Sequence, residues 1–218
     1  MTPLKVVYII EGLDCSGKKT TAGRVEKWFK DHGYSVRICI GPLFAPLQKI
    51  DDFLVSLTYI RTPKLLLKLR KRLYLSAPIM DSVFWRPDRD ADIVLKVSSN
   101  YRTWARALIE GDTKMSGFFE KHRRSFIKYS GAVVLDAAFD ERIRRHREMY
   151  ARDLTQKTEE KRFFDRNESL FERWNSVMTD LMKRDILNVL TIDTTGKDGE
   201  SISFQIIKEI EKLLCTVS

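Results

Sequence analysis

The chain has 218 residues, of which 43% are hydrophobic and 32% are charged. These values are typical of one globular domain with a substantial core, and no apolar run is long enough for a transmembrane helix. The formal net charge of +9 indicates an anionic partner, such as a nucleotide, a nucleic acid or an acidic membrane surface. The cysteines, Cys15, Cys39 and Cys215, lack metal-ligand spacing, which predicts reduced thiols in a cytoplasmic protein.

The first predicted strand runs directly into a glycine-bounded loop. Residues 5–10 (KVVYII) form an apolar run, as expected of a strand buried on both faces of a parallel sheet. Residues 12–18 (GLDCSGK) then fit the GxxxxGK pattern, and a helical pattern over 20–31 follows. Such a loop and the helix N-terminus after it present N–H groups to an anion, and the lysine adds a charge for the β- and γ-phosphates of a nucleotide. The predicted nucleotide-binding residues are Gly12, Asp14, Cys15, Ser16, Gly17, Lys18, Lys19, Thr20 and Thr21.

One position departs from the pattern. The residue after the loop lysine normally carries a hydroxyl group for Mg²⁺, but Lys19 stands there, and Thr20 and Thr21 follow it. Two interpretations stay open. In the first, a neighbouring threonine, with Thr20 as the first candidate, or a water molecule takes that coordination place on Mg²⁺. In the second, metal binding is weakened.

Residues 11–20 (EGLDCSGKKT) resemble the phosphate-binding loop of the thymidylate kinase family of nucleoside monophosphate kinases. The Glu before the loop and the Asp within it are more typical of that family than the glycines are. The resemblance implies a P-loop kinase with ATP and Mg²⁺ as cofactors, with Asp14 near the sugar of the acceptor nucleotide. It also implies a single kinase domain over residues 1–218 with a lid at about 143–166.

A second strand is predicted over residues 34–40, and the family places an acceptor-binding arginine after it. Residues 41–46 (GPLFAP) keep a proline and an aromatic residue but lack the arginine, which weighs against thymidine monophosphate itself. Phe44 either stacks on a base or belongs to the core. Residues 53–80 contain no acidic residue, and 64–74 (KLLLKLRKRLY) predict a basic amphipathic helix. That helix packs on the sheet, binds an anionic membrane surface or a partner, or forms a wall of the acceptor site.

Residues 81–92 are predicted to be a polar connection, and 93–97 a third buried strand. Family members carry an Asp-Arg pair at the end of this strand, where this chain has residues 98–104 (SSNYRTW). The resemblance implies that Arg102 contacts the acceptor phosphate from the first turn of the next helix. Because a phosphate acceptor is already ionised, the missing carboxylate favours a monophosphate over an alcohol. Residues 104–130 predict helix, with a break at 111–112 and Ser116 as a helix cap.

The fourth predicted strand, residues 131–136, ends on Asp136, which matches the strand-end aspartate of the family. The resemblance gives this residue either a supporting role or a contact with the metal or its water. Residues 140–147 then resemble the helix that leads into the lid. A lid supplies arginines to the transferred phosphoryl group, and Arg145 and Arg147 match the family spacing best, with Arg142 and Arg152 as further candidates. The charged residues 153–166 predict a lid loop.

The remaining pattern predicts a helix over 168–183, a fifth strand over 186–193 and a closing helix over 201–214. Thr194 lies where family members contact adenine. Five strands alternating with helices predict a three-layer α/β fold with a parallel sheet and ligands at its carboxyl edge. The predicted function is transfer of the ATP γ-phosphate to a dTMP-like pyrimidine nucleoside monophosphate, with Lys18, Arg102, Arg145 and Arg147 as catalytic residues. The alternatives are a P-loop kinase of a nucleoside or membrane-associated alcohol, and a nucleotide-binding protein with little catalysis. A homodimer is left open, and nucleic acid is not expected as a partner.

Overall fold

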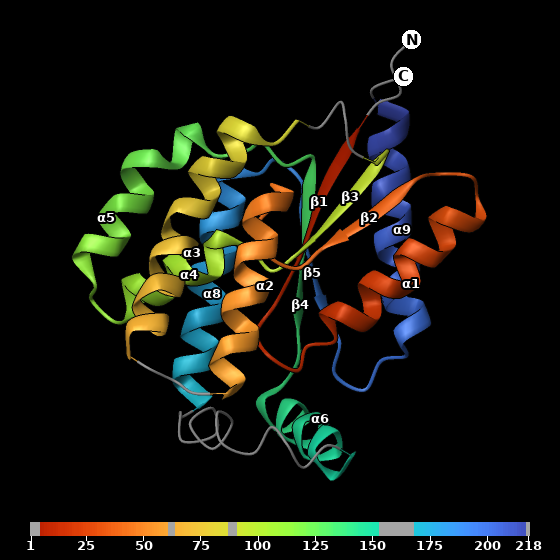
Figure 1. Cartoon of the computed structure of the whole chain (residues 1–218). Helices are drawn as coiled ribbons and strands as arrows, with labels where there is room; N and C mark the ends of the chain where they lie inside the picture. Colours follow the sequence, from red (N-terminus) through yellow and green to blue (C-terminus); the bar gives the residue numbers. More distant parts are fainter. Residues whose placement is uncertain (1–4, 61–63, 87–90, 153–167, 217–218) are drawn as a thin grey trace.

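The computed structural model describes residues 5–60, 64–86, 91–152 and 168–216, and its centre is a five-stranded parallel sheet (Figure 1). The strand order is β2-β3-β1-β4-β5, so the first strand lies in the middle. Isoleucine, valine and leucine dominate these strands because both faces of the sheet are covered. The predicted fold class is thereby confirmed. The strands are β1 (Val6–Glu11), β2 (Val36–Cys39), β3 (Ile93–Val97), β4 (Gly131–Asp136) and β5 (Val189–Asp193).

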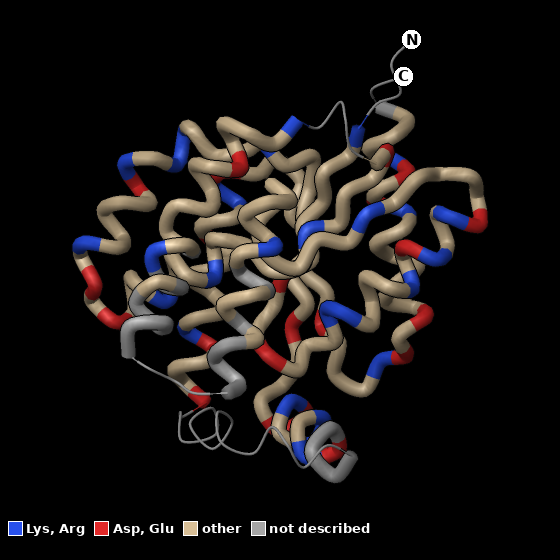
Figure 2. Tube along the Cα trace, viewed as in Figure 1, with Lys and Arg blue, Asp and Glu red and all other residues tan. Residues whose placement is uncertain are grey.

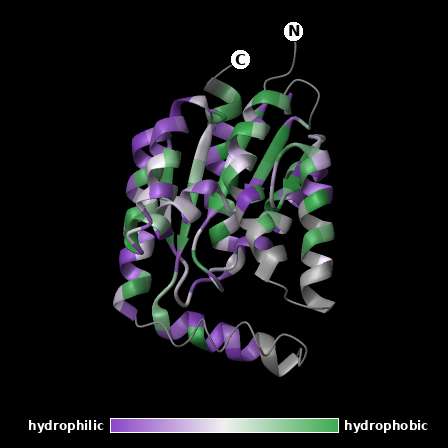
Figure 3. Ribbon diagram, turned by 60° about the vertical axis from the view of Figure 1, so that its left-hand side comes forward, coloured by the Kyte–Doolittle hydropathy of each residue, from purple (hydrophilic) through white to green (hydrophobic). Residues whose placement is uncertain are grey.

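Helices cover both faces of the sheet and give the molecule three layers (Figure 1). On one face, α1 (Lys18–Asp31) and α9 (Gly199–Thr216) pack on each other and on a core that includes Ile10, Leu95 and Ile206. The opposite layer is larger, and Figure 3 shows hydrophobic strand segments between helices that carry both hydrophobic and hydrophilic residues. It contains α2 (Ala45–Ile60), α3 (Lys64–Phe84), α4 (Asn100–Ile109), α5 (Thr113–His122) and α8 (Glu168–Asp185), with a short 3₁₀ turn at Arg123–Ser125.

Three sequence-based expectations were incomplete or wrong in this second layer. Residues 45–60, to which we assigned no element, form α2, and α3 extends to Phe84 through Pro78, so the polar connection predicted from residue 81 begins later. Asp81 therefore lies inside a helix, where its buried carboxylate accepts the N–H groups of Leu43 and Phe44. The cap of α5 is Asp112, whose side chain accepts the Met115 N–H.

The elements relevant to ligand binding meet at the carboxyl edge of the sheet. There, α6 (Phe139–Arg152) leaves β4 and projects below the sheet (Figure 1), and it carries closely spaced charges of both signs (Figure 2). The helix predicted to lead into a lid is therefore present. The predicted lid loop, residues 153–166, lies outside the described residues, as do the side chains at 149–152, including Arg152.

The basic segment 64–74 forms the first half of α3. Most of its side chains, including those of its lysines, lie outside the described residues, so the prediction of a membrane-binding surface stays untested. Within the described parts of the chain, no helix is both long and apolar enough to cross a membrane.

Candidate active site

The loop of residues 12–18, which we call the phosphate loop, connects β1 to α1 at the carboxyl edge. Its conformation depends on glycine at two positions, because Gly12 has φ +147° and Gly17 has φ +90°. A Cβ atom on Gly12 would also lie 2.4 Å from the Leu135 carbonyl oxygen and 2.5 Å from Ser16 Oγ. Cys15, with φ +62°, is a non-glycine residue in the left-handed region and such strain is concentrated at functional sites. The loop is therefore packed tightly against the neighbouring strand β4.

The N-terminus of α1 is open to an anion. Gly17 is its cap and forms no side-chain cap bond, and the first turn contains no acidic residue. The first N–H groups of a helix have no partner within the helix, and they favour negative charge. Thr20 is exposed in this turn together with Lys19, whereas Thr21 is buried. Ser16 Oγ is buried and has no hydrogen-bond partner among the described residues, which leaves a donor within the loop for a bound phosphate.

Lys18 folds back over the phosphate loop. Its Nζ donates to the carbonyl oxygens of Gly12 at 2.7 Å and of Leu13 at 2.8 Å. Burial, followed by the positive charge of Arg102, lowers the pKa of Lys18 from 10.5 to about 8. The ammonium is therefore only weakly stabilised by the protein itself, and phosphate oxygens in the loop would favour its charged form.

Arg102, in the first turn of α4, faces the phosphate loop. Its Nη2 lies 2.5 Å from Asp14 Oδ1, so the predicted acceptor-phosphate residue is paired with the predicted sugar-contacting residue. Trp174 on α8 holds the arginine in place, because its indole N–H donates to the Arg102 carbonyl and its ring lies 5.5 Å below the guanidinium. The structure thus brings Arg102 and Asp14 together at one edge of the phosphate loop.

Arg145 on α6 bridges two loops of the carboxyl edge. Its guanidinium donates to the Thr194 carbonyl at 2.7 Å, the Thr194 hydroxyl at 3.2 Å and the Cys15 carbonyl at 3.4 Å, while Glu141 accepts its Nε–H. The Thr194 hydroxyl itself donates to the Asp136 carbonyl. Arg145 and Thr194 therefore order the edge beside the phosphate loop, whereas the predicted catalytic residue Arg147 is exposed on the same helix.

Asp136 ends β4 beside the phosphate loop. Its Oδ1 accepts from Arg142 Nη2 at 2.5 Å and from the Ala137 N–H, and its side chain is 42% exposed. The described residues contain no cluster of three or more His, Cys, Asp or Glu that could hold a metal. Nucleotide-bound Mg²⁺ needs only one or two protein oxygens besides phosphates and water. The Asp136 carboxylate and the Thr20 hydroxyl supply oxygens of that kind, and their contact with a metal stays a prediction.

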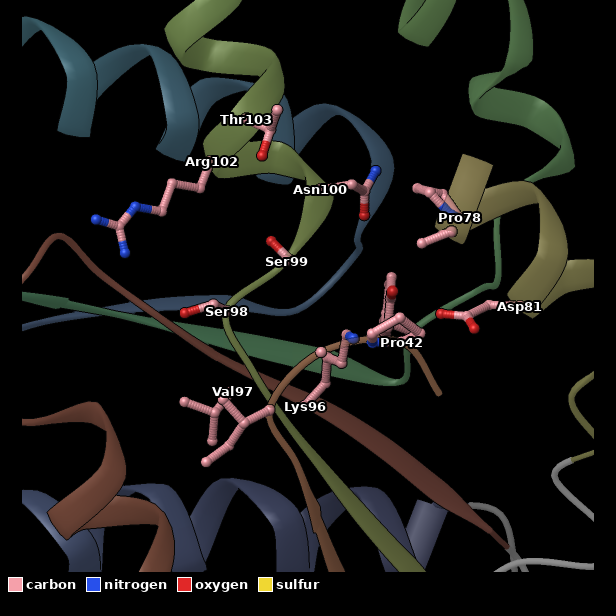
Figure 4. Close-up of a pocket in the computed structure, with 14 residues that line it drawn as sticks. Pro42, Pro78, Asp81, Lys96, Val97, Ser98, Ser99, Asn100, Arg102 and Thr103 are labelled. Carbon is pink, nitrogen blue, oxygen red and sulfur yellow. The ribbon is translucent and has the colours of Figure 1, made fainter. Parts of the chain in front are cut away.

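A cavity of about 310 Å³ lies beside the phosphate loop, between α3, the residues after β2 and the β3–α4 junction. We call it the α3 pocket. Figure 4 shows Lys96 entering it from β3, Asp81 from α3, and Arg102 pointing away from it, toward the loop aspartate. Its lining is mixed polar and apolar: Ile40, Gly41, Pro42, Ala77, Pro78, Asp81, Lys96, Val97, Ser98, Ser99, Asn100, Arg102, Thr103 and Tyr129.

Glu11 joins the phosphate loop to the α3 pocket. This fully buried carboxylate accepts the Gly12 N–H at 3.0 Å, the Ser99 N–H at 2.6 Å and the Ser99 hydroxyl at 2.7 Å. Ser98, next to it, is a second non-glycine residue with positive φ, at +66°. The start of the loop and the wall of the pocket are therefore fixed to each other by one side chain.

Sequence reasoning did not assign Lys96, Asp81 or Ser99 to the site. A signal existed for the first two, because Lys96 is the only charged residue of an otherwise apolar strand, and Asp81 is the first acid after the acid-free segment 53–80. Ser99 gave no such signal, since its partner Glu11 is 88 positions away. Phe44, a candidate for base stacking, packs on Phe84 with ring centroids 5.4 Å apart.

Comparison with known proteins reveals likeness in structure. At the level of sequence, neither a family model nor a curated protein matches the chain. Solved structures do match. The thymidylate kinase of Ehrlichia chaffeensis gives a TM-score of 0.60 at 13% identity, covering 96% of this chain and 99% of that chain. The thymidylate kinase of Candida albicans, described as having broad substrate specificity, gives 0.60 at 13% identity, covering 96% and 92%. The chain has a thymidylate kinase-like fold.

Proposed function

We propose that the protein transfers the γ-phosphoryl group of ATP to a nucleoside monophosphate. The observation that carries this proposal is the phosphate loop, which combines Lys18 folded over the loop, a Ser16 hydroxyl without a partner among the described residues, and a helix N-terminus without a side-chain cap. Two features add support: the fold is shared with thymidylate kinases, and the α3 pocket opens beside the loop. The proposed protein is one kinase domain over residues 1–218, acting in the cytoplasm.

The residues divide the work of transfer. Loop N–H groups and Lys18 bind the donor phosphates, and the acceptor enters the α3 pocket. A phosphate oxygen of the acceptor forms a bond to the γ-phosphorus of ATP. The bond between that phosphorus and the β–γ bridging oxygen breaks, and ADP leaves. Arg102 and Arg145 lie at either side of the loop, where their charge would stabilise the transferred group. Arg147 would approach only on closure of the lid. Thr20 and Asp136 would hold Mg²⁺, which shields the phosphate charges.

The acceptor is proposed to be a pyrimidine nucleoside monophosphate resembling dTMP. The reason is the shared fold together with the absence of a carboxylate after β3, where residues 98–104 read SSNYRTW. A hydroxyl acceptor needs a base, whereas a phosphate is already ionised. Homodimer formation and a membrane contact through residues 64–74 remain predictions without a structural observation behind them.

The test is an acceptor screen with the purified protein, ATP and Mg²⁺, in which ADP release is followed for each nucleoside monophosphate and nucleoside. We expect turnover on a pyrimidine monophosphate. Lys18→Met should lower kcat by about 10²- to 10³-fold, since it removes a fixed positive charge that would stabilise the transferred phosphoryl group. Lys27→Met, an exposed residue of the same helix, is the matched control and should keep full activity. Turnover that survives Lys18→Met, or ATP binding without turnover on any acceptor, would contradict the proposal.

A further inference from the structure

Lys96 is a lysine at a position where a strand normally carries an apolar residue. It lies on the interior strand β3, paired with Ile9 of β1 and Cys39 of β2, and the residue is 6% exposed. Its neighbours on the strand point to the opposite face, where they belong to the core under α1. A lysine buried this deeply is rare unless it is paired, so its environment requires an explanation.

The described residues provide no direct partner for this ammonium. No hydrogen bond and no ion pair to Lys96 is formed within the ranges that the structure describes. Asp81 is near but is already used, because one of its oxygens accepts the Leu43 N–H and the other the Phe44 N–H, each at 2.9 Å. Glu11, the other nearby carboxylate, accepts from Gly12 and Ser99. Both carboxylates thus favour the charge of Lys96 at longer range without satisfying its donors.

The unpaired ammonium lines the α3 pocket. In Figure 4 Lys96 rises from β3, with its nitrogen on the side where Asp81 and Pro42 lie. Asn100, from the start of α4, lines the same pocket, and its Nδ2 is buried with no hydrogen-bond partner among the described residues. A half turn of that amide exchanges its oxygen and nitrogen, and would present a second donor to the pocket. The ammonium without an acceptor, joined by the Asn100 amide in its turned orientation, predicts a ligand that supplies oxygens.

We propose that Lys96 is the specificity-determining residue of the α3 pocket and binds an oxyanion of the acceptor, with Asn100 as a second donor. This inference rests on the proposed function, which places the acceptor in that pocket. Arg102 also lines the pocket, but its guanidinium is already engaged, because it is paired with Asp14. A charged hydrogen bond to an oxyanion satisfies a buried ammonium better than a neutral carbonyl does.

Stability distinguishes a ligand-binding role of Lys96 from a structural one. Burial lowers the pKa of Lys96, against the opposing influence of Cys39, Asp81 and Glu11. An unpaired buried charge destabilises a fold, and an apolar residue of similar size relieves that cost. Replacement of Lys96 by methionine should therefore leave the thermal midpoint unchanged or raised, while the affinity for the oxyanion falls.

Isothermal titration calorimetry without ATP and Mg²⁺ tests the inference on four proteins: wild type, Lys96→Met, Lys96→Arg, and Lys121→Met as an exposed-lysine control. The probes are the tightest-binding nucleoside monophosphate, its nucleoside and inorganic phosphate. We expect Lys96→Met to raise the Kd of the monophosphate by about 10- to 100-fold and to leave that of the nucleoside unchanged. Lys96→Arg should regain part of the affinity, and Lys121→Met should match wild type.

The outcomes separate this inference from the proposed function. Equal losses of affinity for the nucleoside and the monophosphate would overturn oxyanion binding by Lys96, because Lys96 would then contact the base or sugar. Unchanged affinity in Lys96→Met would overturn it as well. Binding of inorganic phosphate alone, lost in Lys96→Met, would support an oxyanion site whose ligand is free phosphate. If Lys96-dependent binding is found but no acceptor is ever phosphorylated, the proposed function fails and the oxyanion site stands.

Discussion

The phosphate loop and the α3 pocket lie side by side but depend on the sequence in different ways. The loop is built from neighbouring residues, with strand, turn and helix N-terminus in one continuous segment. The pocket gathers Asp81, Lys96 and Ser99 from α3, β3 and the residues before α4. In the proposed function, the loop binds the phosphates of the donor, and the charges of the pocket select the acceptor. Binding of the donor can thus be inferred from local chemistry, and binding of the acceptor only from tertiary structure.

The largest effect is expected from a methyl group at the start of the loop. Gly12→Ala adds a Cβ atom 2.4 Å from the Leu135 carbonyl oxygen at φ +147°. Strain and overlap together should lower the free energy of unfolding by about 3 kcal/mol and abolish ATP binding. Gly23→Ala is the matched control, because it lies inside α1 and, apart from its chain neighbours and the backbone of its own helix, no atom lies within 4 Å of the added carbon. That variant should be stabilised by about 0.5–1 kcal/mol. Urea unfolding measures both.

If Gly12→Ala bound ATP as wild type does, the tight packing of the loop on β4 would not be needed for its function. If instead both alanine variants lost the same stability, the loss would reflect glycine replacement in general. Either result would contradict the view that the phosphate loop depends on the conformation of its own residues.

The second effect tests whether the two regions are coupled. Glu11→Gln replaces one carboxylate oxygen by an NH₂ group, which cannot accept. The oxygen that remains can serve either the Gly12 N–H or the Ser99 N–H, so the other donor loses its acceptor. Leaving buried donors unpaired costs about 1–3 kcal/mol, so the midpoint of urea unfolding should fall. Glu26→Gln, which removes a surface pair with Lys30, should change stability by less than about 1 kcal/mol.

Because Glu11 contacts both regions, its replacement should weaken ATP and acceptor binding together. Calorimetry of each ligand separately measures this. A loss confined to ATP would show that Ser99 keeps its position without Glu11, and that the pocket wall is independent of the loop.

The fold could be predicted from the sequence to a large extent because its signals are local. The buried strands at 93–97 and 131–136 have the predicted bounds, since short and predominantly apolar runs define them. Errors arose where a polar residue has a distant partner. Asp81 suggested a polar connection, yet it is buried in α3 because it accepts N–H groups 37 and 38 positions away. Ser116 has the residue type of a helix cap, but Asp112 precedes it and caps the helix one turn earlier.

The same difference between local signals and distant contacts explains which site residues could be predicted. Residues of the phosphate loop could be named from one motif, whereas the contact of Arg145 with Cys15 spans 130 positions and no pattern indicates it. The sequence shows Lys96 as a charge within an apolar strand, but the role of this side chain can be inferred only from the pocket that it lines. The roles of the lid residues beyond Arg152 stay predictions, because they lie outside the described residues.

The smallest expected effect concerns a proton in the donor site. Lys18 has a pKa of about 8 in the free protein, because burial and Arg102 disfavour its ammonium. Phosphate oxygens favour that ammonium and raise its pKa. At pH 8 the free lysine is about half protonated and the bound lysine fully so, and ATP binding should take up about half a proton. At pH 6.5 the free lysine is already charged, and this uptake should vanish.

Calorimetry in two buffers with different ionisation enthalpies measures the proton uptake, and Lys18→Met should abolish its dependence on pH. The sign is fixed by linkage. The pKa of this lysine is lower in the folded protein than its ordinary 10.5, so its contribution to the free energy of unfolding rises between pH 8 and 10.5. ATP affinity should fall over the same range, because the charge it needs is being lost. Proton release on binding, or an uptake that survives in Lys18→Met, would show that the lysine does not meet the phosphates. The donor site would then depend on its backbone N–H groups alone.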